Sequence, residues 1–521
     1  MRRRSGEQGL LPTLGDGMRP VTVSRICAVR MMCPRGAALV VSLLLSGCAH
    51  FSADGGMLAV QEQTGSVLAQ DVMKISTEDG AAAAQARVKA LLAKTMTVES
   101  AVQIALLNNR GLQAAYNELG VSEAQLIEAS LPPAPTISLA RLTGAELELE
   151  RQIVQNVLAL LTLPRRREIA EDRFRAAQSR AVEATLKTAA DARRAYQRAV
   201  AAGQITKFLE ESRVSAEAIS ELAKKLGETG AMPKLEQARQ HAFYAEDSGQ
   251  LALGRLKQRS EREKLNRALG LWGDQTNYRR PASLKSLPGK PEPENNIENR
   301  AITSRADLEA ARLDLAALAK DFGLTTATRY IDVLNVSALS RNEIKRVTDV
   351  SYTLNPGPPA SLNRIETPAK EETPRQGFNV EFQIPIYDFG EVRTIRAQEV
   401  YSQAVNRLTE RAVNARSEAR EAYIAYRGTY DIARHFDKEV LPLREIISQQ
   451  ELLAYNGMLS DLFSLLTDAR ARIAANVQAI EAKRDFWLAD ADLKAAIFGG
   501  GGGEMGVAQG QATIQPAGTA Q

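Results

Sequence analysis

Cysteine and histidine are scarce in this chain, which contains only three of each in 521 residues. Cys48 is the last cysteine, and Cys27 and Cys33 precede it in a predicted targeting segment. The body of the chain therefore has no material for a disulfide framework, a cysteine metal site or thiol chemistry. His50, His241 and His435 are too scattered for a set of metal ligands or for a base with its orienting partner, so we expect surface or packing roles for them.

Catalytic signatures are also lacking, with no Gly-rich phosphate loop, no nucleophile elbow and no paired-carboxylate motif. An excess of one charge is missing too. The formal charge of +4 arises in the first 48 residues, which hold seven arginines and two acids, and beyond them 59 basic residues face 60 acidic ones. This balance gives no support to nucleic-acid binding. We therefore predict a protein that is not an enzyme, with no catalytic residue, cofactor, metal site or nucleic-acid partner.

The N-terminus has the features of a targeting signal rather than of a folded segment. The apolar run Ala37–Leu45 follows three arginines and is too short to span a bilayer. Its Leu-Ser-Gly-Cys ending resembles the lipobox of bacterial lipoproteins, which implies that Cys48 is the lipid attachment site and the first mature residue. The alternative is an ordinary signal peptide with an incidental cysteine.

The stretch Phe378–Tyr455 changes its hydrophobic period once. Apolar and polar residues alternate from Phe378 to Ile386, which predicts a strand with one apolar and one polar face, suited to a position between lipid and water. From Glu391 the apolar residues recur every three or four positions, which predicts a helical rod of about 90 Å. Pro442 lies within this rod and is expected to kink it.

Upstream, residues 50–95 are weakly patterned and predict an extended arm with one short helix near 85–94. Thr97 is expected to cap a helix that ends near Leu131. Two alternating runs, 136–142 and 147–154, predict a β-hairpin. A rod then runs from Pro164 to about residue 228, turns at Gly230 and returns over 233–271. Trp272 and Trp487 near helix ends are expected to pack in the core, and the basic run 165–167 either snorkels at a membrane boundary or begins a solvated rod.

Beyond a Pro-rich linker the pattern begins again. Residues 305–311 echo 109–115 at an offset of 196, and the offset grows by 25 across the second strand region, which places an insertion at 341–376. Its Pro, Thr and charged residues predict a solvent-exposed loop. The predicted domains are a signal peptide (1–48), an N-terminal arm (49–96), a first repeat (97–271), a linker (272–303), a second repeat (304–498) and a flexible tail (499–521).

The predicted fold class is mainly α with a small β part, built from two structural repeats of long helical hairpins plus β-hairpins. Four strands cannot close a membrane barrel, because the smallest closed bacterial barrels have eight and open edges are not tolerated in lipid. The chain must therefore borrow strands from copies of itself. Three protomers would give a twelve-stranded barrel, with the rods extending it as an α-helical barrel.

Several short motifs in the same order resemble the TolC family of outer-membrane efflux proteins over about residues 97–498. They are Thr97–Ala101 with Leu106–Asn109, Leu131–Pro133, Ile384–Ile386 with Gly390, and Tyr455–Gly457 before Leu465–Ala469. The resemblance implies a homotrimer with a twelve-stranded outer-membrane β-barrel continuous with a periplasmic helical barrel. It also implies a lipid anchor in the outer membrane, with a periplasmic adaptor (membrane fusion) protein and an inner-membrane efflux pump as partners.

The resemblance further implies a gate. The family narrows its tunnel near the turn into the final helix of each repeat, with acidic rings at the tip, and Asp461 and Asp468 occupy that stretch here. Three copies of one carboxylate around an axis would attract cations and respond to pH. The alternative is that both residues face solvent outside the hairpin.

Two functional classes remain open at this point. The favoured function is a passive exit duct for heavy-metal or drug efflux, coupled to a pump through an adaptor, and residues 454–489 are reminiscent of ducts associated with heavy-metal efflux. The alternative is a periplasmic coiled-coil adaptor or a structural lipoprotein. Adaptors usually have one hairpin and Gly-rich β domains, whereas this chain has two repeats, each with strands.

Overall fold

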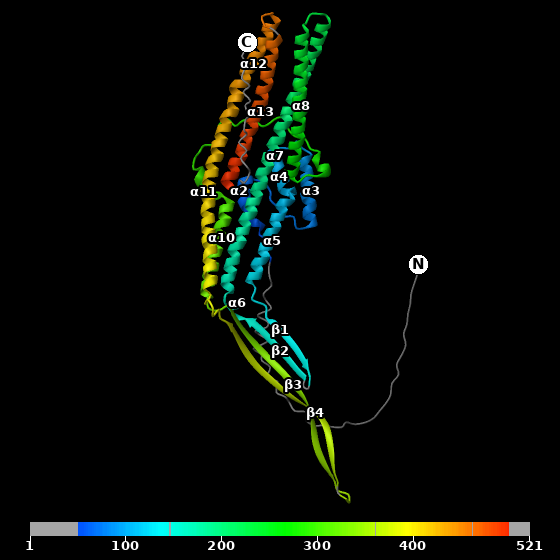
Figure 1. Cartoon of the computed structure of the whole chain (residues 1–521), viewed down its shortest axis with the longest axis vertical. Helices are drawn as coiled ribbons and strands as arrows, with labels where there is room; N and C mark the ends of the chain where they lie inside the picture. The colour runs from blue at the N-terminus through cyan, green and yellow to red at the C-terminus, as the bar shows by residue number, and fades with distance from the viewer. Residues whose placement is uncertain (1–50, 145–146, 360, 461, 500–521) are drawn as a thin grey trace, which may run out of the picture. The chain divides into compact units, whose positions relative to one another are not determined.

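The computed structural model describes residues 51–144, 147–359, 361–460 and 462–499, which belong to one compact unit. This unit consists mainly of long helices, with one antiparallel sheet (Figure 1). Its elements before the linker are α2 (Met57–Leu68), α3 (Glu78–Leu92), α4 (Val98–Asn108), α5 (Arg110–Ser130), β1 (Thr136–Thr143), β2 (Leu147–Asn156), α6 (Val157–Leu161), α7 (Leu163–Glu228) and α8 (Lys234–Leu269). The later elements are η1 (Gly273–Thr276), α9 (Ile297–Ser304), α10 (Ala306–Ala327), β3 (Val333–Asn355), β4 (Ser361–Gln383), α11 (Glu391–His435), η2 (Phe436–Val440), α12 (Leu441–Asn456) and α13 (Leu462–Phe498).

The N-terminal arm is more ordered than the sequence predicts. Instead of one short helix it forms two, α2 and α3. Val60 of α2 and Val88 of α3 are fully buried in the largest apolar cluster of the described residues, against side chains of α4, α7 and α8. The prediction of an extended arm was wrong because these helices carry few apolar residues, which become a core only when other helices cover them.

The helix predicted from Thr97 to Leu131 is two helices. Thr97 caps α4 as expected, accepting a hydrogen bond from the backbone N–H of Ser100 at 3.1 Å. The chain leaves helical geometry at Asn109, whose side-chain oxygen accepts from the backbone of Gly111 and Leu112 and starts α5. The Asn109 amide also donates to the carbonyl of Ala268, so this break fastens the end of α8.

The two rods of the first hairpin follow the sequence prediction closely. Helix α7 runs to Glu228 and α8 starts at Lys234, with Gly230 in the turn at φ +75°. Much of the buried face of α7 is alanine, which lets neighbouring backbones approach closely. Its partners include α8, α10, α5, α13 and α4.

The second rod is interrupted where proline predicts a kink. Helix α11 continues into one π-helical stretch, η2, directly before Pro442 at the start of α12. Proline has no N–H to donate and its ring crowds the preceding turn, so the wider π turn accommodates it. The second cluster of buried apolar residues joins α9, α11 and α13 around Tyr430 and Phe486, whose rings lie 5.6 Å apart.

The two tryptophans differ in their packing. Trp487 packs against Phe486 with ring centroids 5.0 Å apart and donates its indole N–H to the carbonyl of Lys285 at 3.1 Å. Trp272 is 78 % exposed, so its predicted core position was wrong. After the left-handed C-cap of α8 at Gly270, the core position is taken by Leu271, and Trp272 follows it on the surface.

The sheet has the order β1-β2-β3-β4, with every neighbouring pair antiparallel. The first hairpin, β1 and β2, lies where the alternating runs predict it. The segment 341–376, predicted as an exposed loop, instead continues β3 and β4 into a long hairpin that pairs without a break from Arg341↔Arg375 to Asn355↔Ser361. Two of its five prolines, Pro368 and Pro374, lie in the outer strand β4, where a missing N–H disturbs the ladder least.

Candidate functional site

Where all four strands pair, the sheet has one mainly apolar and one polar face. The strand register puts Ile137, Ile153, Ala338 and Phe378 in one row across the four strands. Phe378 is 83 % exposed, and Val380 and Phe382 continue the same face along β4. Strands β1 and β4 each have a single neighbour among the described residues, so both outer edges of this apolar surface are open.

The opposite face of the sheet is polar and carries cross-strand ion pairs. Arg341 of β3 contacts Glu150 of β2 at 3.0 Å, and Arg375 of β4 contacts Glu343 of β3 at 3.3 Å. Asn335 donates to Glu381 at 3.0 Å on the same face. Such a division is what a strand needs when one side of the sheet meets hydrocarbon and the other meets water.

The tip of the second helical hairpin is a tight turn between α12 and α13. Gly457 ends α12, and Met458 follows in the left-handed region at φ +56° with a side chain that is 94 % exposed. Ser460 donates a hydrogen bond back to Glu451, which closes the turn. Asp461, one of the two predicted gate residues, lies outside the described residues.

Asp468, the other predicted gate residue, lies in α13 with only 9 % of its surface exposed. Its Oδ1 atom is 4.0 Å from a guanidinium nitrogen of Arg444 in α12 and has no hydrogen-bond partner in the described part of the chain. The carboxylate is therefore held between the two helices of its own hairpin, close to the tip. Sequence reasoning missed Arg444, because the pair spans 24 residues and no local pattern announces it.

The first hairpin has a polar interior near the same end. Gln240 of α8 is fully buried, and neither its amide oxygen nor its amide nitrogen finds a partner among the described residues. Burial raises the pKa of Asp247, an effect that a hydrogen bond from Ser212 and the charge of Arg213 only partly offset. His241 is 2.6 Å from the hydroxyl of Ser220 and packs within the hairpin. An interior of this kind holds two helices together less tightly than an apolar seam does.

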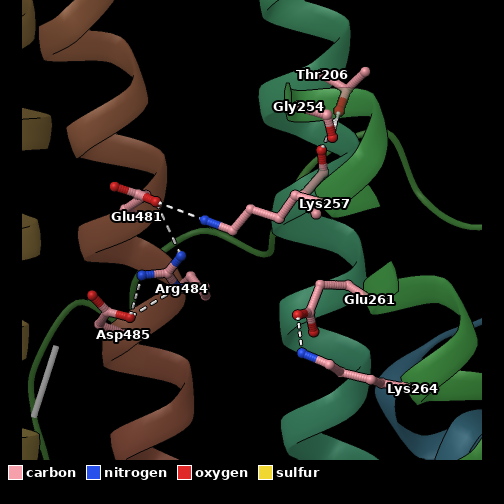
Figure 2. Close-up of polar contacts among 9 residues, drawn as sticks. Thr206, Gly254, Lys257, Glu261, Lys264, Glu481, Arg484 and Asp485 are labelled. Atoms are coloured by element: carbon pink, nitrogen blue, oxygen red, sulfur yellow. Dashed lines mark hydrogen bonds and ion pairs between the residues drawn. The ribbon is translucent and has the colours of Figure 1, made fainter. Parts of the chain in front are cut away.

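Ion pairs tie the two hairpins together. Arg470 of α13 contacts Glu246 of α8 at 2.9 Å and lies over the ring of Phe243, 5.3 Å from its centroid. Further along, Lys257 of α8 contacts Glu481 of α13 at 3.3 Å. Figure 2 shows Lys257 reaching across to Glu481, which also binds Arg484 of its own helix. Each pair is partly exposed and contributes little alone. Small apolar clusters also join the hairpins, including Leu209 and Leu251 packed against Ile473 of α13.

The remaining predicted site residues lie apart from these features. Cys48, the predicted lipid attachment site, and His50 lie outside the described residues. His435 of α11 contacts Glu439 at 3.0 Å on the helix surface. Over the described ranges, no group of three or more His, Cys, Asp or Glu side chains is placed to hold a metal ion. No helix there combines the length and apolar character needed to cross a membrane.

Solved structures of outer-membrane channels share this fold. The chain superposes on CusC with a TM-score of 0.60 at 17 % identity, covering 77 % of this chain and 92 % of CusC. The superposition on the Campylobacter jejuni CmeC outer membrane channel has a TM-score of 0.62 at 16 % identity and covers 78 % of this chain and 86 % of CmeC. The superposition on the open state of the Neisseria gonorrhoeae MtrE outer membrane channel has a TM-score of 0.57 at 14 % identity and covers 77 % of this chain and 89 % of MtrE. No family model and no curated sequence matches the chain.

Proposed function

We propose, from the fold that this chain shares with outer-membrane channels, that it is the exit duct of a tripartite efflux system. In this proposal three copies form a twelve-stranded barrel in the outer membrane, and the helical hairpins of two repeats continue it as a periplasmic tunnel. The duct is passive and is coupled to an inner-membrane pump through a periplasmic adaptor. Cys48 carries the lipid that anchors each N-terminus to the membrane.

The observation that carries the proposal is the open, two-faced sheet. Its apolar face is exposed in a single chain, and its outer strands β1 and β4 leave backbone groups without sheet partners. Unpaired backbone groups are too costly in hydrocarbon, so a sheet of this kind enters a bilayer only when further strands close it. A coiled-coil adaptor in the periplasm would not need an exposed apolar sheet face.

The gate proposal concerns the tip of the second hairpin. We place Asp461 and Asp468 there, the latter against Arg444, as the carboxylates that select cations and hold the duct shut. Support comes from the burial of Asp468 close to the turn and from the polar interior of the first hairpin near the same end. A carboxylate repeated three times in a narrow lumen repels its copies, and a nearby arginine reduces this repulsion.

Planar-bilayer conductance tests the duct and its gate together. The purified chain is expected to give discrete conductance steps with a preference for cations. Asp468→Ala and Asp461→Ala are expected to reduce that preference and to raise the open probability, because each removes three charges from the constriction. Asp431→Ala serves as the control, since this exposed carboxylate pairs along the surface of α11 with Arg427 and is expected to leave the channel unchanged.

Two results would count against these proposals in different ways. A parent protein that gives no conductance would contradict the duct. Steps of unchanged selectivity and open probability in both aspartate variants would remove these residues from the gate and leave the duct standing.

Lipidation is expected at Cys48. Metabolic labelling with a radioactive fatty acid should label the parent chain, and Cys48→Ser should abolish the label, because a serine hydroxyl does not replace the thiol in this modification. Cys33→Ser is the matched control and should label normally, since this cysteine lies in the segment that is removed. Full incorporation in the Cys48 variant would contradict a lipid anchor at this position.

A further inference from the structure

A hollow of about 850 Å³ is lined by side chains of α5, α7, α10 and α11. These four helices pack side by side in that order (Figure 1). All four contribute to its lining, including the two outermost, which do not neighbour each other. One hollow can touch both ends of a four-helix layer only where the layer curves around it. The hollow therefore marks the concave face of this layer.

Arginines dominate the charge of this hollow. Arg166, Arg173 and Arg180 recur every seven residues on one face of α7, and Arg407 and Arg411 lie one turn apart on α11. The only lining acids are two aspartates of α10, which leaves an excess of three positive charges.

Four of these arginines are available to a ligand. Arg180 is neutralised by a two-pronged contact with Asp314, at 2.7 and 2.8 Å. Arg166, Arg173, Arg407 and Arg411 have no ion pair and no side-chain hydrogen bond within the part of the chain that the structure describes. Arg411 lies close enough to Glu183 of α7 for its charge to act against the rise in the pKa of that carboxyl.

Several cations that lie close to the hollow without lining it are paired with acids. The neighbours of Arg166 in the sequence, Arg165 and Arg167, each bind a glutamate further along α7, at 2.8 and 3.0 Å. Close by, Lys320 of α10 pairs with the buried Asp172 at 2.6 Å. These three cations are neutralised by acids outside the hollow, whereas Arg166, Arg173 and Arg407 inside it have no acidic partner among the described residues.

The wall between the arginines is partly apolar. Leu126, Phe174, Leu315 and Leu408 contribute to it, one from each of the four helices. Guanidinium groups recognise the planar or tetrahedral oxygens of carboxylates, sulfonates and phosphates, and an apolar wall favours hydrocarbon or aromatic groups. A ligand that satisfies both has an anionic head and an apolar body.

We propose that this hollow binds amphipathic organic anions, and that these are a class of cargo. The second part rests on the proposed function, in which the concave face of the helical layer lines the tunnel and three copies of the arginine cluster surround the path. Exposed guanidinium groups in water bind each anion weakly enough for release, as a conduit requires. The tunnel would thus attract anions here, in contrast to the carboxylates proposed for the tip.

The test uses 8-anilinonaphthalene-1-sulfonate, an aromatic sulfonate whose fluorescence rises when it binds. The full chain in phosphatidylcholine nanodiscs is titrated with this probe, and empty nanodiscs are subtracted. We expect saturable binding that weakens as salt is raised, because the arginines are open to solvent. The double variant Arg407→Gln/Arg411→Gln should weaken binding by about tenfold, the size expected for the loss of charge-assisted hydrogen bonds.

Two controls isolate the charge. Arg416→Gln removes an exposed arginine of α11 that does not line the hollow and should leave binding unchanged. N-phenyl-1-naphthylamine, the uncharged analogue of the probe, should not distinguish the double variant from the parent. Circular dichroism of each variant verifies that the helices are intact.

Equal affinity of the parent and the double variant for the sulfonate would overturn the proposal, and so would an equal loss for the uncharged analogue. The conductance measurement keeps this failure separate from that of the duct. A chain that conducts but does not bind the sulfonate through these arginines is a duct without this site, and a chain that binds it without conducting has the site but not the tunnel.

Discussion

Replacing Arg305 with alanine is expected to lower the free energy of unfolding by about 3–5 kcal/mol, the usual cost of removing one partner of a buried ion pair. Arg305 is 5 % exposed at the start of α10. It donates to both carboxylate oxygens of Asp307, at 3.0 and 2.8 Å, and to Glu418 of α11 at 2.6 Å. It also reaches the carbonyl of Ala496 at 3.3 Å and so joins three helices.

The free energy of unfolding is expected to fall because Arg305→Ala leaves the Asp307 carboxylate without its ion-pair partner. Burial lowers the pKa of Arg305, but its hydrogen bonds to the two carboxylates outweigh burial and raise the pKa overall. The guanidinium therefore stays charged over the whole working range of pH. On α7, burial and the proximity of Asp307 raise the pKa of Glu183.

Urea denaturation followed by circular dichroism in detergent measures this loss. Arg165→Ala is the control, because Arg165 pairs with Glu168 on the surface of α7 and such a pair contributes less than about 1 kcal/mol. Equal midpoints for the two variants would show that the buried pair does not hold the three helices together.

The substitution Gly390→Ala is expected to cost about 2–5 kcal/mol, from a left-handed backbone and a steric clash. Gly390 caps α11 at φ +72°, where the chain passes from the sheet into the rod. An added Cβ atom would lie 2.2 Å from the carbonyl oxygen of Arg329. The backbone itself would have to move, since no flexible side chain can give way.

Gly428→Ala is the control, for which we expect the opposite change in stability. Gly428 lies inside α11, and an added Cβ atom would meet nothing within 4 Å. Because alanine is the better helix former, Gly428→Ala is expected to stabilise the chain by about 0.5–1 kcal/mol. Urea midpoints that move in the same direction for both variants would contradict the proposed role of Gly390.

Local patterns were enough to predict much of the fold. The change of period after Ile386 predicts the end of β4 and the start of α11, because alternation and helical recurrence each depend on a few neighbouring residues. The turn at Gly230 and the hairpin of β1 and β2 were predicted for the same reason. These features need no knowledge of what packs against them.

Features that depend on distant contacts were not predicted. Helices α2 and α3 have weak patterns of their own and bury Val60 and Val88 only through helices that come later in the chain. The segment 341–376 has a loop-like composition, yet it forms strands because each half pairs with the other. In the candidate site, Arg444 beside Asp468 and the four-helix hollow likewise depend on packing. The seven-residue spacing of Arg166, Arg173 and Arg180 was the one local signal of that hollow.

The mass of the detergent-extracted particle tests the central claim most directly. The described strands form a sheet with two open edges, and the proposed function requires other copies to complete it, three copies giving the twelve strands of a closed barrel. By native mass spectrometry, the account predicts a single species that contains three chains. Its mass is expected to lie below about 170 kDa, three times the chain mass of 56.7 kDa, because the signal segment is removed from each chain. A stable particle containing one chain would contradict it.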